Sequence, residues 1–462
     1  MRRYPNDLTM KPGDYKFNGT IAYKNSRSDL CVPCPLLVFK TQYHSGHLTP
    51  VHMPTLTRFR FLARALGAVL TASAVHAYDL GGIDFHGSLS STAAYSNNYN
   101  YLGDTAESAD LIQNEVILNG TKRFDNGLKA AAQVYIYSFA GYNTATLDFA
   151  NLDYSVTQEF GIRVGRNKTP IGFYSESQDL DQIRTFASLP LNFYPRSFRA
   201  FAVANDGISF YGNVAAEKAG TFDYQIFYGQ VPSLDEQQPT MVGEGLRSMR
   251  PNMVYGGSVI WNAPVDGLRF GYSYLQTAGA SLTTNPAVVI ANVFSTPFSG
   301  DIDYTTQVTS AEYTWGKWTA TTEYRYTSSG INLTNDKAGL GGAIPASSIV
   351  KQVQAEKDEF YLQLTYQATD KLGLGVYYAY SDYTPEGTQA TNDKGGIDTD
   401  LAFATSYAIT PWWLIKGEVH LMNGIHSLNG AGNSNPGAPT NTTGGTDDQK
   451  WTYYVLKTTL SF

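Results

Sequence analysis

The feature that most constrains this chain is the alternation of apolar and polar side chains in short segments spread over residues 83–462. In residues 83–95, for example, Phe85 and Leu89 share one face, whereas Ser88 and Ser90 share the other. A period of two is the pattern of a β-strand with one apolar face. Sixteen segments are predicted as strands: 83–95, 111–122, 128–139, 146–156, 160–168, 207–213, 221–228, 254–261, 268–275, 304–315, 318–327, 360–369, 372–381, 401–407, 413–421 and 451–462.

The connections between these segments alternate in length. Every second connection is a short turn, such as the Asn-Gly turn after Phe124 or Gly316-Lys317. The others are mostly long and cover 96–110, 168–205, 229–252, 276–303, 328–355, 382–397 and 422–450, with a brief one near Gly141. Short turns on one rim and long loops on the other are typical of outer-membrane barrels. The sequence therefore predicts an all-β fold, a transmembrane antiparallel β-barrel of about 16 strands.

Charged residues keep to one face of the predicted strands. Glu323 and Arg325 alternate with aromatic residues and threonines, and Lys416 and Glu418 alternate with aliphatic ones. Because a lipid-facing Arg or Lys near the membrane midplane costs about 2–4 kcal/mol, these four residues are predicted to line the lumen. Aromatic residues at strand ends fit interfacial girdles: Tyr95, Tyr228, Trp261, Trp315, Trp318, Trp413 and Trp451.

The first 77 residues read as a leader rather than as folded protein. Residues 53–77 combine three arginines, a short apolar core and the terminal Val75-His76-Ala77, which is the pattern of a secretory signal peptide. Residues 1–52 precede that signal, so we interpret them as an over-extended start. The mature chain is then 78–462, a single exported barrel.

Composition narrows the class further. Removing residues 1–77 takes out 10 of 33 basic and 3 of 40 acidic side chains, which leaves 23 basic and 37 acidic residues and no cysteine. An acidic, exported chain lacks the basic surface that binds nucleic acid, so no such partner is predicted. Residues 78–462 contain no run of about 18 apolar residues, which excludes a membrane helix on length.

The connection from Lys168 to Asn205 is far longer than a turn requires, and long connections within a compact domain tend to be functional. Three acids within six residues are flanked by bases on both sides. If this segment folds into the barrel, acids facing bases would narrow the pore; the alternative is a solvated loop face. The predicted pore constriction comprises Arg163, Arg166, Lys168, Glu176, Asp179, Asp181, Arg184, Arg196 and Arg199.

Two short runs carry a family resemblance. The last strand, W-T-Y-Y-V-L-K-T-T-L-S-F, ends on Phe462, and G-R-N-K-T-P-I-G occupies 165–172. Together they resemble the Gram-negative outer-membrane porin superfamily and, more distantly, its phosphate-selective branch. The resemblance implies sixteen strands, a homotrimer, and a third external loop that folds inward as the constriction. The bilayer and lipopolysaccharide of the outer membrane would then be partners, and small hydrophilic solutes or ions would diffuse through.

No catalytic or cofactor motif stands out. The mature chain has three scattered histidines, so no metal site is predicted, and neither a cofactor nor an enzymatic activity is expected. Two other readings stay open: an outer-membrane barrel enzyme or adhesin without channel activity, and a soluble secreted β-protein. The inward-facing charges are also open to two readings, because they either line a pore or pair with one another across strands.

Overall fold

The structure is a computed structural model of the whole chain. It describes residues 78–79, 81–106, 108–139, 142–194, 203–232, 246–250, 253–284, 298–335, 349–385, 396–425, 428 and 449–462. The chain divides into two compact units, Met1–Thr71 and Ala72–Phe462, and all described residues belong to the second. The predicted signal peptide and the residues before it lie outside the described residues.

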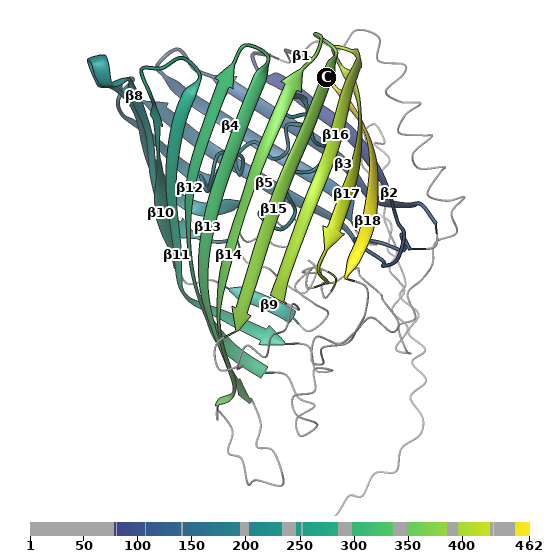
Figure 1. The fold of residues 1–462 in the computed structure, drawn as a ribbon. Helices are drawn as coiled ribbons and strands as arrows, with labels where there is room; N and C mark the ends of the chain where they lie inside the picture. The colour runs from purple at the N-terminus through teal and green to yellow at the C-terminus, as the bar shows by residue number, and fades with distance from the viewer. Residues whose placement is uncertain are drawn as a thin grey trace, which may run out of the picture. The chain divides into compact units, whose positions relative to one another are not determined.

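The described residues form one antiparallel sheet that closes on itself (Figure 1). The ring runs from β2 through β8, continues with β10 through β18, and closes where β18 pairs with β2 and β8 pairs with β10. These sixteen strands confirm the predicted barrel. Closure satisfies the backbone groups of every ring strand without leaving an edge, as a lipid environment requires.

Each predicted strand matches one strand of the ring, and the two remaining strands, β1 and β9, are short. The bounds are β1 Tyr78–Asp79, β2 Asp84–Ser96, β3 Asp110–Arg123, β4 Leu128–Phe139, β5 Tyr142–Ser155, β6 Gly161–Lys168, β7 Ala204–Ala215, β8 Thr221–Gln230, β9 Leu246–Arg250, β10 Met253–Asn262, β11 Leu268–Thr284, β12 Phe298–Trp315, β13 Trp318–Asn335, β14 Ile349–Gln367, β15 Leu372–Pro385, β16 Ile397–Thr410, β17 Trp413–Asn423 and β18 Lys450–Ser461. Two 3₁₀ turns, η1 Asp181–Ile183 and η3 Glu217–Ala219, lie between strands.

The alternation of connection lengths is confirmed by these bounds. Strands β12 and β13 are joined by two residues, and β16 and β17 likewise, whereas β6 and β7 are separated by 169–203. Strands β11 to β14 extend well beyond their predicted ends toward the long-loop rim, and β9 pairs with the extension of β11. No helix among the described residues is long and apolar enough to span a membrane.

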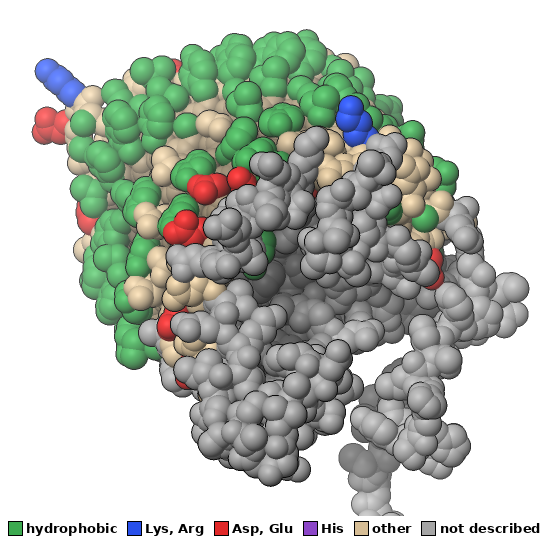
Figure 2. Space-filling view, turned by 60° about the horizontal axis from the view of Figure 1, so that its bottom comes forward, with side chains coloured by type: hydrophobic (Ala, Val, Ile, Leu, Met, Phe, Trp, Pro, Cys, Tyr) green, Lys and Arg blue, Asp and Glu red, His purple; other side chains and the backbone are tan. Residues whose placement is uncertain are grey.

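The two faces of the wall differ as predicted. On β13 and β14, Tyr324 and Leu362 are exposed, whereas Glu323 and Glu359 are buried on the opposite face. In Figure 2 the visible outer surface is mostly covered by hydrophobic side chains. The barrel therefore turns an apolar face outward and a polar face inward.

The prediction of an outward-facing aromatic girdle is wrong for one residue, Trp451. Trp451 is 2% exposed and lies on the inner face, where it packs edge-on against Tyr101 and Tyr453. Its indole nitrogen donates to the carbonyl of Gly424. The adjacent outward position belongs to Thr452, so an aromatic residue at a strand end does not by itself indicate the outer face.

Candidate functional site

The β6–β7 segment, residues 169–203, is a long connection of which the structure describes 169–194 and 203. Its main-chain and side-chain groups hydrogen-bond to inward-facing residues of strands that are far apart in the ring. Three groups of contacts hold it, on β11–β14, on β17–β18 and on β4–β5.

The first group centres on Glu323 of β13. Its carboxylate accepts hydrogen bonds from the amide of Phe173 at 2.7 Å, from Tyr361 at 2.6 Å and from Tyr194. Gly172 precedes this contact with φ +68°, and its amide donates to the hydroxyl of Ser273 at 2.8 Å. A Cβ at Gly172 would lie 2.8 Å from the carboxylate of Glu323, so this close approach requires glycine.

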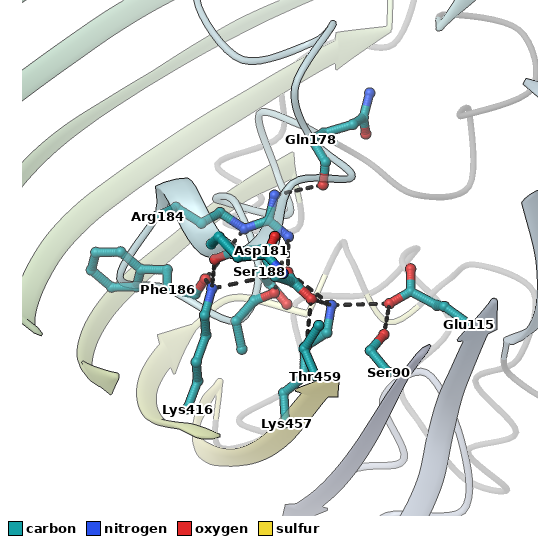
Figure 3. A network of polar contacts seen from close by, with 12 residues as sticks. Ser90, Glu115, Gln178, Asp181, Arg184, Phe186, Ser188, Lys416, Lys457 and Thr459 are labelled. Atoms are coloured by element: carbon teal, nitrogen blue, oxygen red, sulfur yellow. Dashed lines mark hydrogen bonds and ion pairs between the residues drawn. The ribbon is translucent and has the colours of Figure 1, made fainter. Parts of the chain in front are cut away.

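The second group centres on Asp181 in η1 (Figure 3). One carboxylate oxygen lies 2.6 Å from Arg184, and the other lies 2.8 Å from Lys457 and 2.7 Å from the hydroxyl of Thr459. Lys416 donates to the carbonyl of Asp181 at 2.7 Å. Burial raises the pKa of Asp181, but Lys457, Arg184 and Lys416 outweigh it and hold the pKa well below its usual range.

Neighbouring charges extend this second group along the wall. Lys457 also lies 2.9 Å from Glu115 of β3, to which Ser90 of β2 donates at 2.5 Å. Glu418 of β17 accepts the amide of Ala187 at 2.6 Å and lies 3.3 Å from the imidazole of His420. A chain of charge-assisted hydrogen bonds, which are stronger than neutral ones, thus ties the segment to the β17–β18–β2–β3 wall.

The third group is on β4–β5. Lys168, the last residue of β6, lies 2.5 Å from Asp179 and 3.4 Å from Asp148. Gln133 of β4 donates to both of these carboxylates, at 2.9 and 2.8 Å. Glu176, in contrast, has an exposed side chain.

Apolar packing reinforces these polar contacts. Phe186 and Phe193 of the segment are each 1% exposed and lie 4.9 Å from the ring of Tyr377 and 5.1 Å from that of Tyr361, respectively. Ile171, Leu189 and Tyr194 belong to the same cluster. The segment is therefore held as a packed element, by both hydrogen bonds and buried apolar surface.

A further inward-facing cluster lies beside the segment on β4–β7. Asp153 accepts from Arg163 at 3.2 Å, lies 2.9 Å from Lys129, and accepts a hydrogen bond from Tyr211. The carboxylate is 3% exposed, whereas the two bases are 20% and 38% exposed. One buried carboxylate therefore pairs with two basic side chains that are more exposed to solvent.

The predicted site residues fall into three kinds. The first kind makes buried ion pairs or hydrogen bonds within the segment or to it: Lys168, Asp179, Asp181, Arg184, Glu323, Arg325, Lys416 and Glu418. The second kind, Arg163 and Glu176, retains solvent contact. The third kind, Arg196 and Arg199, lies outside the described residues, and Arg166 is described separately below. Arg325 pairs with Glu359 on the neighbouring strand at 2.5 Å, which favours pairing over an open position in the pore.

Arg166 pairs with a residue of the neighbouring strand, and its place at the constriction stays a prediction. The register pairs it with Asp206, in line with the outward-facing Val164 and Phe210, and its guanidinium contacts Asp206 at 2.6 and 2.8 Å. Sequence reasoning also missed important inner-wall partners, above all Lys457, Glu115, Asp148, Asp153 and Glu359.

Comparison with known proteins finds no matching family model and no matching curated sequence. Among solved structures, the chain is similar to outer-membrane expressed OmpT of Vibrio cholerae, with TM-score 0.49 and 12% identity over 84% of this chain and 100% of that one. It is also similar to the anion-selective porin from Comamonas acidovorans, with TM-score 0.47 and 14% identity over 82% and 99%. The outer-membrane channel DcaP of Acinetobacter baumannii gives TM-score 0.47 and 10% identity over 84% and 100%. These likenesses are weak, and the barrel assignment rests on the strand register itself.

Proposed function

We propose that this chain is an outer-membrane porin through which small hydrophilic solutes or ions diffuse passively. The observation that carries the proposal is the distribution of charge across the wall. Ionisable residues such as Glu323, Lys416 and Lys457 face inward, while the outer face of the same strands is apolar. Such a wall is suited to lipid outside and water inside.

The β6–β7 segment is proposed as the constriction of this pore. Its contacts on β4–β5, β11–β14 and β17–β18 support a path across the interior. Asp179 and Asp181 are engaged in buried ion pairs, so the acid most available to passing ions is Glu176. Enclosure raises the pKa of Glu176, while Arg163 and Lys168 lower it. The side chain itself keeps solvent contact.

The remaining parts of the proposal concern location and assembly. The exported protein would begin at Tyr78 after removal of 53–77, insert into the outer membrane of a Gram-negative cell beside lipopolysaccharide, and assemble as a homotrimer. The apolar outer wall supports membrane insertion. The homotrimer is the assembly that the resemblance to porins implies, and a trimer form of OmpT from Vibrio cholerae is among the similar solved structures.

The experiment is conductance of the refolded protein in planar lipid bilayers. We expect steady, ohmic channels, and we expect Glu176→Gln to lower the cation-to-anion permeability ratio measured from reversal potentials under a salt gradient. A folded, inserted barrel that never conducts would overturn the proposal and favour the enzyme or adhesin reading. Conducting channels with an unchanged ratio in Glu176→Gln would remove only the role given to this acid.

A further inference from the structure

Two large aliphatic side chains of the β6–β7 segment are exposed. Leu180 is 49% exposed and Ile183 is 59% exposed. The other exposed large apolar residues among the described ones lie on the outward faces of strands or in the short turns. Outward-facing residues are covered by lipid in the proposed porin, but a residue of this segment has no lipid beside it.

The local structure fixes these two side chains in place. Leu180 directly precedes η1 and Ile183 is its last residue, and Asp181 at its start is 4% exposed and held by Lys457, Arg184 and Thr459. Gln182 between them hydrogen-bonds to the hydroxyl of Ser461. Because the wall-facing side of η1 is pinned by these contacts, the turn cannot rotate to bury Leu180 and Ile183 without breaking buried ion pairs.

Other large apolar side chains of the same segment are buried. Ile171, Phe186 and Phe193 pack fully against the inner wall a few residues away. Within the described part of the segment, Leu180 and Ile183 are thus the large aliphatic side chains that stay accessible. Charged side chains of the inner wall and of the segment also keep solvent contact, namely Glu176, Arg163 and Lys129.

We propose that Leu180 and Ile183 form an apolar contact in the pore for small amphiphilic solutes, which carry an aliphatic or aromatic part together with a charged or polar end. The inference rests on the proposed porin function and names its preferred solute class. The apolar part of the solute lies against these two side chains while its polar end stays hydrated or contacts the neighbouring charged residues. Purely hydrophilic solutes of the same size pass without this contact.

The test compares L-leucine with L-asparagine, two zwitterions of similar shape that differ in the polarity of the side chain. Each is titrated into the bath of a conducting bilayer, and the concentration that halves the solute-sensitive part of the ion current is measured. Contact with roughly 40 Å² of apolar surface, at about 25 cal/mol per Å², changes a binding constant about fivefold. We therefore expect half-block by leucine at an about fivefold lower concentration than by asparagine.

The decisive variant is Leu180→Ser/Ile183→Ser, in which leucine and asparagine should block alike. The matched control is Val156→Ser/Val265→Ser, because these valines are 49% and 50% exposed but lie in short turns at the rim. The control should keep the wild-type difference. Heat-modifiable mobility and unitary conductance show that each variant is folded.

Equal block by both amino acids in the wild type, or a difference that persists in Leu180→Ser/Ile183→Ser, would overturn the inference while leaving the porin function intact. A folded barrel that carries no ion current fails at the earlier step and overturns the porin function itself. The two failures are therefore read from different measurements.

Discussion

Replacing Asp181 by Asn tests whether one buried carboxylate holds the β6–β7 segment against the wall. Asn keeps the shape and one acceptor oxygen but removes the negative charge that lies between Arg184, Lys457 and Lys416. Breaking a buried ion pair by removing one partner typically costs about 3–5 kcal/mol, because the other charge is left uncompensated. The structure decides where in that range this substitution falls.

The remaining partners place the cost at the lower end of the range. Lys457 keeps Glu115 at 2.9 Å, and Arg184 keeps the carbonyl of Gln178 at 2.5 Å. A loss of about 3 kcal/mol raises the opening constant of the segment by roughly a hundredfold. The sixteen-stranded ladder does not depend on Asp181, so the barrel itself should remain folded.

Hydrogen–deuterium exchange measured by mass spectrometry on the refolded protein reads this opening directly. Peptides covering 169–194 should exchange up to about a hundredfold faster in Asp181→Asn, while peptides of β12 and β13 stay protected. Asp84→Asn is the matched control, since Asp84 pairs with Arg123 at the surface with side chains 44% and 71% exposed. Unchanged exchange of 169–194 in a folded Asp181→Asn barrel would refute the anchoring role.

Three further predictions follow from other contacts. The pKa of Asp181 is lowered, so the stabilisation from its charge is complete above the ordinary value of 3.8 and is lost only as pH falls through the lower folded-state value. Exchange of the η1 amides at matched intrinsic rates should therefore stay constant from pH 7 to pH 4, and earlier release would contradict this role of Asp181. Leu362→Arg changes an outward position that is 57% exposed, and it should lower the free energy of unfolding in vesicles by up to about 2–4 kcal/mol. A loss within about 0.5 kcal/mol would mean that this face contacts water rather than lipid. Gly172→Ala should destabilise the closed segment by more than the cost of a positive φ, which is about 1–2 kcal/mol, because the new Cβ would lie 2.6 Å from the hydroxyl of Tyr194. Gly316→Ala is the control, since Gly316 has φ +59° and open space around it. Equal losses of stability in the two variants would count against the contact with Tyr194.

The sequence was sufficient for the barrel because one physical contrast repeats along the whole chain. Wherever lipid and water lie on opposite sides of the wall, side chains must alternate, and each such stretch was predicted as a strand. The extensions of β13 and β14, such as 328–335 and 349–359, were missed because both faces leave the apolar band there. Without a difference in environment, residues such as Ser328, Ser329 and Gly330 show no alternation to detect.

The contacts of the segment could not be predicted from local patterns. Asp181 lies 276 residues from Lys457 and 278 from Thr459 in the sequence, and their meeting depends on the closure of the ring and the course of the segment. The alternation of the last strand, with Leu456 58% exposed and Lys457 2% exposed, was the signal in the sequence that could have found Lys457. That signal identifies a candidate lining residue but not its partner.

The three acids between 176 and 181 cannot all act as filter charges, because the structure engages them differently. Asp181 and Asp179 are neutralised at close range, by Lys457 at 2.8 Å and by Lys168 at 2.5 Å, so a passing ion meets an ion pair rather than a lone charge. Glu176 has no such contact within 4 Å among the described bases, and its side chain is exposed. Neutralising Glu176 should therefore change the permeability ratio without loosening the segment, whereas neutralising Asp181 should loosen the segment first and alter the ratio only through that movement.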